Sequence, residues 1–414
     1  MKAFPPPNAA PDPAGAAEPP RRIGLVTPAW PGTATANGIA SAVAHLATGL
    51  TAIGHEVTII AHWSDAPHDD PRVIVLDEEP VPLLGRLLFR LFPDRVVRRA
   101  MIARLTKATR KAIARDGIDV LLMEETFGWA GEMRRALPIP VVITLHGPHW
   151  LHRAIPGRPR RGPDARRENW EAAGLHHIDG LIAPSRSVQD QTGVEWGLPN
   201  LPTTVIGNPV ALDRSAPPAA RLKVPHLLFV GRFDRIKGGD LVLDAFARIA
   251  ARHPDCRLTF VGPDGGLAQP DGSTLHLAEA VARLPQPIRD RIEVLGRKSR
   301  AEVEALRSTH PITLIASRYE TFGVALIEAM AAGSAIVSTR VGGCAEVLRD
   351  GETGFLVATE DAQALADACL KLLDDPDLAL RLGQAAQADV AARFSPETIA
   401  REVVAFLAPI CRKS

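Results

Sequence analysis

Two glutamates, Glu320 and Glu328, lie on either side of a Phe-Gly pair that opens an apolar helical pattern. We expect Glu320 in a loop and Glu328 more than one turn into the helix, so the two carboxylates would face different parts of one ligand. The amides of Phe322, Gly323 and Val324 fall at the helix N-terminus, where unpaired N–H groups and the helix dipole favour phosphate. Gly323 lets the backbone approach such an anion closely. The segment predicts a nucleotide-sugar site.

A second candidate cluster lies in residues 225–239, where a buried strand, a Gly turn and a cationic loop precede a helical pattern. The loop carries Arg232 and, five residues later, Lys237. A nucleoside diphosphate gains negative charge as its bond to a sugar breaks. A planar guanidinium and a mobile ammonium can neutralise that charge without a metal. Taken alone, the same residues also fit an exposed loop with ordinary surface cations.

The elements that must position these residues follow an alternating pattern of short apolar runs and longer helical stretches, which is typical of a parallel sheet wrapped by helices. The first unit is a strand at 22–28, a loop through Asn37-Gly38, a helix over 39–53 and a strand after Gly54. Further strands are expected at 72–76, 119–123, 141–145, 180–183 and 203–206, and then near Leu227, Leu258, Ile292, Ile312 and Ile336. The chain is therefore predicted to form two Rossmann-like domains that bind ligand between them.

The spacing of the two glutamates, with Phe-Gly after the first and Glu-Ala-Met-Ala-Ala-Gly from Glu328 to Gly333, resembles the signature of retaining GT-B glycosyltransferases of the group 1 or family 4 type. This superfamily includes glycogen synthases and mannosyltransferases. The resemblance covers nearly everything from Arg22 to about Leu407 and is stronger in the second domain, where residues 341–346 and 350–356 match later family motifs. It implies an α/β GT-B fold with two facing domains and the active site in the cleft.

The resemblance also implies a role for each candidate residue. Arg232 and Lys237 would bind the diphosphate, Glu320 the sugar hydroxyls and Glu328 the ribose. His146, at the end of the strand-like run 142–147, would donate or accept a hydrogen bond with the transferred sugar and would not bind a metal. The complete expected donor site consists of Gly38, Arg232, Lys237, Glu320, Thr321, Phe322, Gly323, Val324 and Glu328.

The same comparison suggests domain boundaries. We expect a disordered tail at 1–20, an acceptor domain at 21–208, a linker at 209–224, a nucleotide-sugar domain at 225–394 and a C-terminal helix at 395–414 that returns to the first domain. The Ser-Pro-Glu string at 395–397 is a helix start signal.

Two features depart from the family pattern. Relatives usually carry Gly-Gly after the first strand, whereas this chain has Asn37-Gly38, in which Gly38 still allows close approach and Asn37 tolerates left-handed geometry. Many relatives place a histidine after the strand near Met123, where this chain has Glu124 and Glu125. These glutamates either bind a hydroxylated acceptor or cap the element. The Asp-Pro-Asp string at 375–377 is interpreted as a helix cap and not as a manganese site.

The expected reaction is transfer of a glycosyl residue from a nucleotide diphosphate sugar to a hydroxyl acceptor, with retention of configuration and without a metal or cofactor. The acceptor could be a glycan, a lipid-linked molecule or a small molecule. A GT-B sugar-nucleotide epimerase and a non-catalytic sugar-nucleotide-binding subunit of an envelope assembly complex are the alternatives.

Composition limits the other partners. A net charge of +1 argues against nucleic-acid binding, and the chain has no run of eighteen apolar residues that would span a membrane. The Pro- and Ala-rich start lacks an apolar signal core, so we expect a cytoplasmic protein. Four well-separated cysteines suggest reduced, packed thiols.

Residues 83–115 carry ten Arg and Lys residues against Asp94 alone, beside an apolar stripe of Leu87, Leu88, Leu91 and Phe92. This segment could meet an anionic membrane surface, peripherally, or bind an anionic lipid-linked acceptor. A solvated cationic helix face is the alternative. A second basic stretch, 153–167, is expected to be a mobile loop near the cleft.

Overall fold

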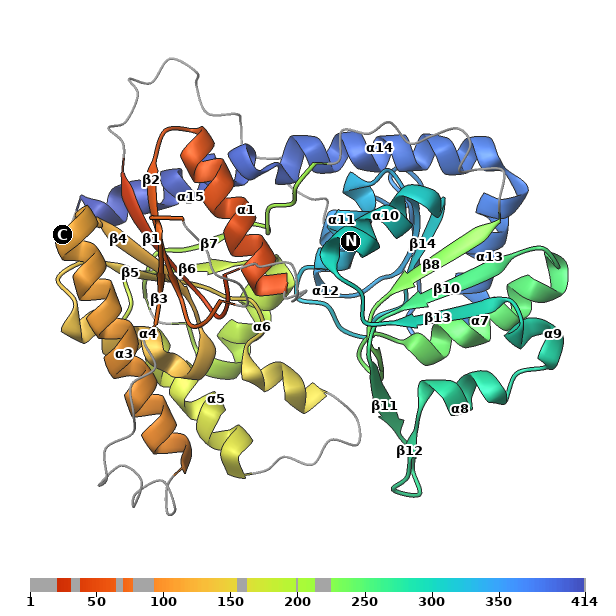
Figure 1. Cartoon of the computed structure of the whole chain (residues 1–414), viewed down its shortest axis with the longest axis horizontal. Coiled ribbons are helices and arrows are strands. Elements are labelled where there is room, and N and C mark those ends of the chain that lie inside the picture. Colours follow the sequence, from red (N-terminus) through yellow and green to blue (C-terminus); the bar gives the residue numbers. More distant parts are fainter. Residues whose placement is uncertain are drawn as a thin grey trace.

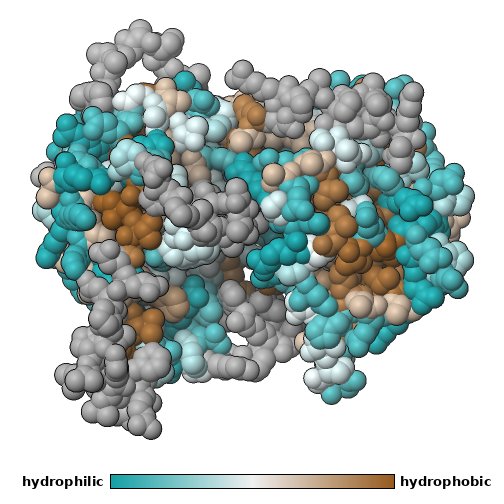
Figure 2. Space-filling view, in the orientation of Figure 1, coloured by the Kyte–Doolittle hydropathy of each residue, from teal (hydrophilic) through white to brown (hydrophobic). Residues whose placement is uncertain are grey.

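The computed structural model describes residues 21–30, 38–64, 70–76, 93–154, 162–198, 200–212 and 225–412. Two α/β units lie side by side, and two long C-terminal helices run along one edge of both (Figure 1). The face shown in Figure 2 is hollowed between the two units, and hydrophilic side chains gather beside the hollow. The α/β GT-B arrangement predicted from the sequence is confirmed.

The first unit contains a seven-stranded sheet in the order β3-β2-β1-β4-β5-β6-β7, and every neighbouring pair is parallel. Its strands are β1 Arg22–Thr27, β2 Glu56–Ala61, β3 Val73–Val75, β4 Val120–Glu124, β5 Val141–Thr144, β6 Gly180–Ala183 and β7 Thr203–Val205. The helical elements are α1 Gly38–Ala52, α3 Pro93–Asp116, η1 Thr126–Gly128, α4 Trp129–Ala136, η2 His149–Ala154, α5 Gly162–Leu175 and α6 Arg186–Trp196. Helices cover both faces, which is why these strands read as continuous apolar runs.

The second unit contains a six-stranded parallel sheet in the order β13-β10-β8-β14-β15-β16. Its strands are β8 His226–Val230, β10 Arg257–Val261, β13 Ile292–Gly296, β14 Ile312–Ile315, β15 Ala335–Thr339 and β16 Phe355–Val357. Its helices are α7 Gly239–Arg252, α8 Leu277–Ala282, α9 Gln286–Arg289, α10 Arg300–Thr309, α11 Val324–Ala331, α12 Gly342–Val347 and α13 Ala362–Asp374. All the strands expected from apolar runs are present, with ends shifted by a residue or two.

A small three-stranded sheet was not predicted. It joins β9 Phe233–Asp234, β11 Asp264–Ala268 and β12 Thr274–Leu275 beside the second unit. These strands are short, and β11 carries two adjacent glycines, so they give no apolar run that a periodicity argument could detect.

The last two helices, α14 Pro376–Phe394 and α15 Pro396–Cys411, connect the units. Asp375 caps α14 by accepting from the amide of Leu378, as the cap interpretation predicted. Ser395 caps α15, and Pro396 separates the two helices because it cannot donate a backbone N–H. Helix α15 packs on α1 of the first unit so closely that a Cβ at Gly49 would lie 2.0 Å from the Pro396 carbonyl oxygen.

None of the four cysteines, all of which lie in the described ranges, forms a disulfide. Cys256, Cys344 and Cys369 are buried and Cys411 is half-buried.

Candidate functional site

The two units meet where α1 and α11 begin. A Cβ at Gly38 would lie 3.8 Å from Cγ2 of Val324, so the start of the first-unit helix faces the start of the second-unit helix. Gly323 caps α11 with a φ of 95°, a left-handed conformation that strains any residue with a side chain. Among the described residues, the N–H groups of Phe322, Gly323 and Val324 donate to no protein acceptor. These amides are therefore available to an anion.

Phe322 contributes to this turn through its backbone only. Its side chain is buried and packs edge-on against Phe394, with ring centroids 5.3 Å apart. The carbonyl of Thr321 accepts a hydrogen bond of 2.7 Å from the Ser185 hydroxyl of the first unit. The turn is thus held from both units.

Lys237 and Glu320 form the charged centre of the site. The Lys237 Nζ lies 2.6 Å from Oε1 of Glu320, and the Ser317 hydroxyl donates to the same oxygen at 2.8 Å. Burial disfavours the charge on Lys237, but attraction to Glu320 and their hydrogen bond outweigh it, so the pKa of Lys237 is raised. Lys237 therefore stays protonated, and its ammonium contacts the Glu320 side chain beside the α11 turn.

Asp234 organises the cationic loop that the sequence singled out. Its carboxylate accepts from the backbone N–H of Lys237 at 2.8 Å and pairs with Nε of Arg232 at 2.7 Å. The Arg232 side chain remains 53% exposed, so a ligand can reach it. At Gly238, where φ is 70°, a Cβ would lie 1.9 Å from the Ala316 carbonyl oxygen, and only glycine permits this approach of the loop to β14.

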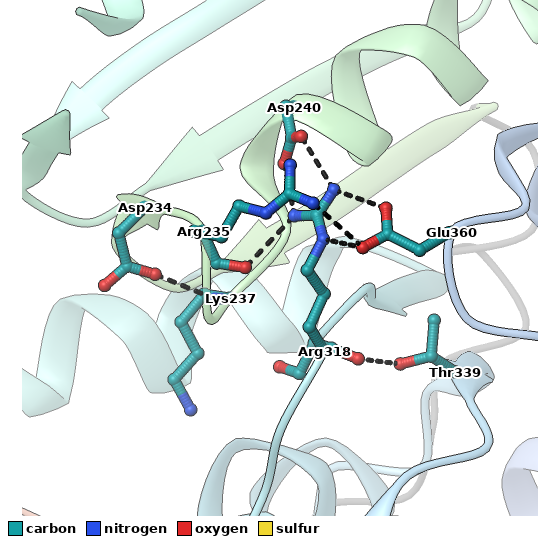
Figure 3. A network of polar contacts seen from close by, with 8 residues as sticks. Asp234, Arg235, Lys237, Asp240, Arg318, Thr339 and Glu360 are labelled. Carbon is teal, nitrogen blue, oxygen red and sulfur yellow. Dashed lines mark hydrogen bonds and ion pairs between the residues drawn. The ribbon is translucent and has the colours of Figure 1, made fainter. Parts of the chain in front are cut away.

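Arg318 supports the cationic loop and was missed by the sequence reasoning. Figure 3 shows its guanidinium between two carboxylates: it makes two bonds of 2.8 Å with Asp240 and bonds of 2.5 and 2.8 Å with Glu360. It also donates to the carbonyl of Arg235 at 3.0 Å. In Figure 3 the Lys237 ammonium points away from this network, and its partner is Glu320. Arg318 thus ties the cationic loop to the strand end that carries Glu320, and fixes the spacing of the Lys237–Glu320 pair.

Glu328 lies apart from Glu320 and has a different partner. Its Oε2 is 2.7 Å from Nη1 of Arg307, a residue of α10 that is only 3% exposed. The two side chains line a cavity of about 270 Å³ between α10, α11 and residues 210–212. Sequence reasoning missed Arg307, because nothing in the local pattern of α10 marks one of its arginines as buried.

In the first unit, Glu125 holds the loop that carries His146. Its carboxylate accepts from the backbone N–H groups of His146 at 3.0 Å and Gly147 at 2.8 Å. The sequence left open whether Glu125 binds an acceptor or caps a backbone element, and in the structure it caps the backbone after β5. Burial lowers the pKa of His146 to about 4, so its imidazole is neutral at physiological pH and can both donate and accept.

Glu124 faces a cavity of about 40 Å³ together with His146, Thr144 and Asn208. It is 3% exposed, and burial, followed by repulsion from Glu125, raises its pKa to about 8. The side chain is therefore mostly protonated at neutral pH. Its proposed contact with an acceptor stays a prediction.

Several contacts join the two units around this site. The Glu346 carboxylate, within the motif at 341–346, accepts from the backbone N–H groups of Arg186 and Ser187 at 2.8 Å each, at the start of α6. His45 of α1 contacts the Pro209 carbonyl through Nδ1 at 3.2 Å and Nη2 of Arg300 through Nε2 at 2.8 Å. Carbonyl oxygen only accepts and arginine only donates, so His45 must be the neutral Nδ1–H tautomer.

The basic segment is only partly described, since the apolar stripe at 87–92 lies outside the described residues. In α3, Arg98 donates to the carbonyls of Phe127 at 2.8 Å and Gly128 at 3.2 Å, and it pairs with Glu132. The prediction that Arg98 belongs to a solvated or lipid-facing surface is therefore wrong. Arg98 instead ties α3 to α4. Arg99, by contrast, is exposed.

The second basic stretch needs a similar correction. Residues 162–167 form the start of α5 and not a loop, and Arg167 pairs with Glu171 at 2.7 Å while its guanidinium lies over the Phe127 ring. Residues 155–161 lie outside the described part.

Within the described ranges, no three His, Cys, Asp or Glu side chains are grouped to hold a metal ion. No described helix is both long and apolar enough to cross a bilayer.

Two family models match the sequence and together span residues 36–389. Glycosyltransferase Family 4 matches residues 36–214, and Glycosyl transferases group 1 matches residues 214–389. The chain belongs to the group 1 glycosyltransferases and is an enzyme of that class.

The glycogen synthase of Mycobacterium tuberculosis is 26% identical over 88% of this chain and 89% of its own length. Among solved structures, a sucrose-phosphate synthase from Thermosynechococcus elongatus is 25% identical with a TM-score of 0.74, and the alignment covers 95% of this chain and 100% of that one. HepE of Anabaena in complex with UDP-glucose is 19% identical with a TM-score of 0.66, over 94% and 99% of the two chains.

Proposed function

We propose that the enzyme transfers a glycosyl residue from a nucleoside diphosphate sugar to a hydroxyl acceptor, with retention of configuration and without a bound metal. The observation that carries this proposal is the contact between the Lys237 ammonium and Glu320 beside the unpaired amides that start α11. A cation and N–H donors suit a diphosphate, and the adjacent carboxylate suits sugar hydroxyls. The complex of HepE with UDP-glucose supports this class of donor on the same fold.

In this mechanism, negative charge grows on the diphosphate as the bond from the anomeric carbon to the phosphate oxygen breaks. Arg232, Lys237 and the α11 amides stabilise that charge, and they are already oriented by Asp234, Arg318 and Gly323. Glu320 accepts from sugar hydroxyls, and the neutral His146 forms a hydrogen bond to the sugar.

Retention follows if the acceptor oxygen attacks the anomeric carbon from the face that the diphosphate leaves. The acceptor proton then passes to a diphosphate oxygen, so that a new glycosidic bond and a nucleoside diphosphate result. No protein side chain needs to bond covalently to the sugar. The proposal specifies the acceptor only by its hydroxyl group, because no described contact distinguishes a glycan from a lipid-linked or small molecule.

The test is a panel of UDP-glucose, UDP-N-acetylglucosamine, GDP-mannose and ADP-glucose. A donor at a hundred times its dissociation constant should stabilise the protein by about 2.7 kcal/mol, which a melting curve detects. The donor that binds is then incubated with water, glucose and simple polyols in the presence of EDTA. Proton NMR should show nucleoside diphosphate and a first-formed product with the anomeric configuration of the donor.

An inverted product would contradict retention, and loss of turnover in EDTA would contradict metal independence. Conversion of the donor into an epimer without transfer, or no binding of any donor, would contradict the proposed function.

A further inference from the structure

The cavity between α10, α11 and residues 210–212 is lined by four charged side chains. These are Arg300, Glu304, Arg307 and Glu328. With a volume of about 270 Å³, the cavity is large enough for a ribose, and one wall is the second glutamate of the motif. The following inference rests on the proposed function, in which Glu328 binds the nucleotide.

Arg307 is buried with few partners. Its Nη1 pairs with Glu328 at 2.7 Å, and its Nη2 donates to the Ala325 carbonyl at 3.4 Å. Its Nε is buried and has no hydrogen-bond partner among the described residues. A buried arginine so incompletely satisfied contributes little net stability, because desolvation of both ions offsets their attraction. An apolar residue would fill the same space at lower cost, so the placement of this cation calls for another explanation.

The second arginine of the cavity is engaged elsewhere. Arg300 bonds to Glu304 through Nε at 2.8 Å and to His45 through Nη2 at 2.8 Å, and in the described part of the chain it forms no hydrogen bond or ion pair with Glu328. Arg307 is therefore the cation that sets the orientation of the Glu328 carboxylate. Arg307 occupies Oε2 of Glu328. The other carboxylate oxygen, Oε1, makes no contact with a described residue and can face the cavity.

We propose that Arg307 is a positioning residue for the nucleotide: it orients Glu328 so that the carboxylate accepts hydrogen bonds from the ribose hydroxyls, and it thereby makes the site prefer ribose over 2′-deoxyribose. A carboxylate that is fixed before binding loses little freedom when the ribose arrives. A site built around a hydroxyl rejects the analogue that lacks it, because the carboxylate is then left without that partner.

The experiment compares the dissociation constants of UDP and 2′-deoxy-UDP by calorimetry, with inorganic pyrophosphate as a ligand that has no ribose. GDP and ADP, each with its deoxy counterpart, replace UDP if they bind more tightly. The variants are Arg307→Met, Arg307→Lys and the matched control Arg300→Met, which removes a cation from the same cavity without touching Glu328.

The parent protein should prefer the ribonucleotide by roughly ten- to hundredfold, the range of one hydrogen bond to a charged group. Arg307→Met should reduce this preference to about threefold or less while pyrophosphate affinity is unchanged. Arg307→Lys should retain part of the parent's preference for the ribonucleotide, and Arg300→Met should retain all of it.

The inference is overturned if the parent protein binds UDP and 2′-deoxy-UDP with a ratio of dissociation constants near one. It is also overturned if Arg307→Met keeps the parent preference. Equal loss of pyrophosphate and UDP binding in that variant also overturns it, since a purely structural role would have this effect. If Arg307→Met does not fold, the preference of Arg307→Lys decides in the same way. If the parent protein binds none of UDP, GDP and ADP, the proposed function itself fails, and that result is distinct from the others.

Discussion

Glu124 should make the protein less stable as the pH rises, and Glu124→Gln should remove that loss. The folded-state pKa of about 8 lies well above the ordinary glutamate pKa of 4.5, so between these two pH values the folded protein binds a proton that the unfolded chain has released. Stability from this group is therefore present at acid pH and lost as the pH rises. Between pH 6 and pH 8 the loss works out to about 2 kcal/mol, which is equivalent to about 4–8 °C in melting temperature for a domain of this size.

Scanning calorimetry at the two pH values tests this, with the transition of the first unit followed separately from that of the second. The parent protein should lose several degrees more between pH 6 and pH 8 than Glu124→Gln does. Glu195→Gln is the matched control, because Glu195 is an exposed glutamate of the same unit, and it should behave like the parent. If the parent and Glu124→Gln lose the same number of degrees, the burial argument for Glu124 is refuted.

The other predictions concern contacts around the site. His45→Phe should lower the melting temperature, since the carbonyl of Pro209 and the guanidinium of Arg300 each lose a partner, at a cost of about 2–4 kcal/mol. Burial lowers the pKa of His45 in the folded state, so the stability that His45 contributes is lost as the pH falls below the usual pKa of 6.5. His45→Gln can still donate and accept, so its melting temperature should fall less than that of the parent between pH 7.5 and 5.5. An equal fall in the two proteins would contradict the assigned tautomer. Glu346→Ala should enlarge the radius of gyration in X-ray scattering and weaken donor binding several-fold, whereas the nearby Glu352→Ala should do neither. Arg98→Gln should lower the melting temperature by several degrees while the exposed neighbour Arg99→Gln leaves it unchanged, and equal melts would show that the contacts of Arg98 with η1 and α4 carry no stability.

Much of the fold follows from local sequence patterns. The strands of both sheets are apolar runs, and the starts of α14 and α15 follow from capping residues, so both are visible without tertiary information. Gly323 follows from the turn that opens an apolar helix, whereas Gly38 follows only from the resemblance to the family, and the structure places both at the meeting of α1 and α11.

The pairings within the site could not be predicted, because they join residues far apart in the chain. Arg307 and Arg300 are both arginines of one short helix, and only the packing of α10 against α11 decides which of them is buried against Glu328. Arg318 lies only two residues before Glu320, yet its contacts depend on Asp240 and Glu360 from two other elements. For Glu125, the choice between acceptor binding and capping depended on where the loop after β5 passes.

The most direct test of the proposed chemistry is the turnover of the bound donor by Lys237→Ala beside the matched variant Lys371→Ala. Lys371 is an exposed lysine of the same unit, outside the site. If Lys237 stabilises the departing diphosphate, its removal should lower turnover by about a hundredfold or more, the effect of about 3 kcal/mol in the transition state, while Lys371→Ala keeps the parent rate. A Lys237→Ala variant that folds, binds donor and turns it over at the parent rate would contradict the account.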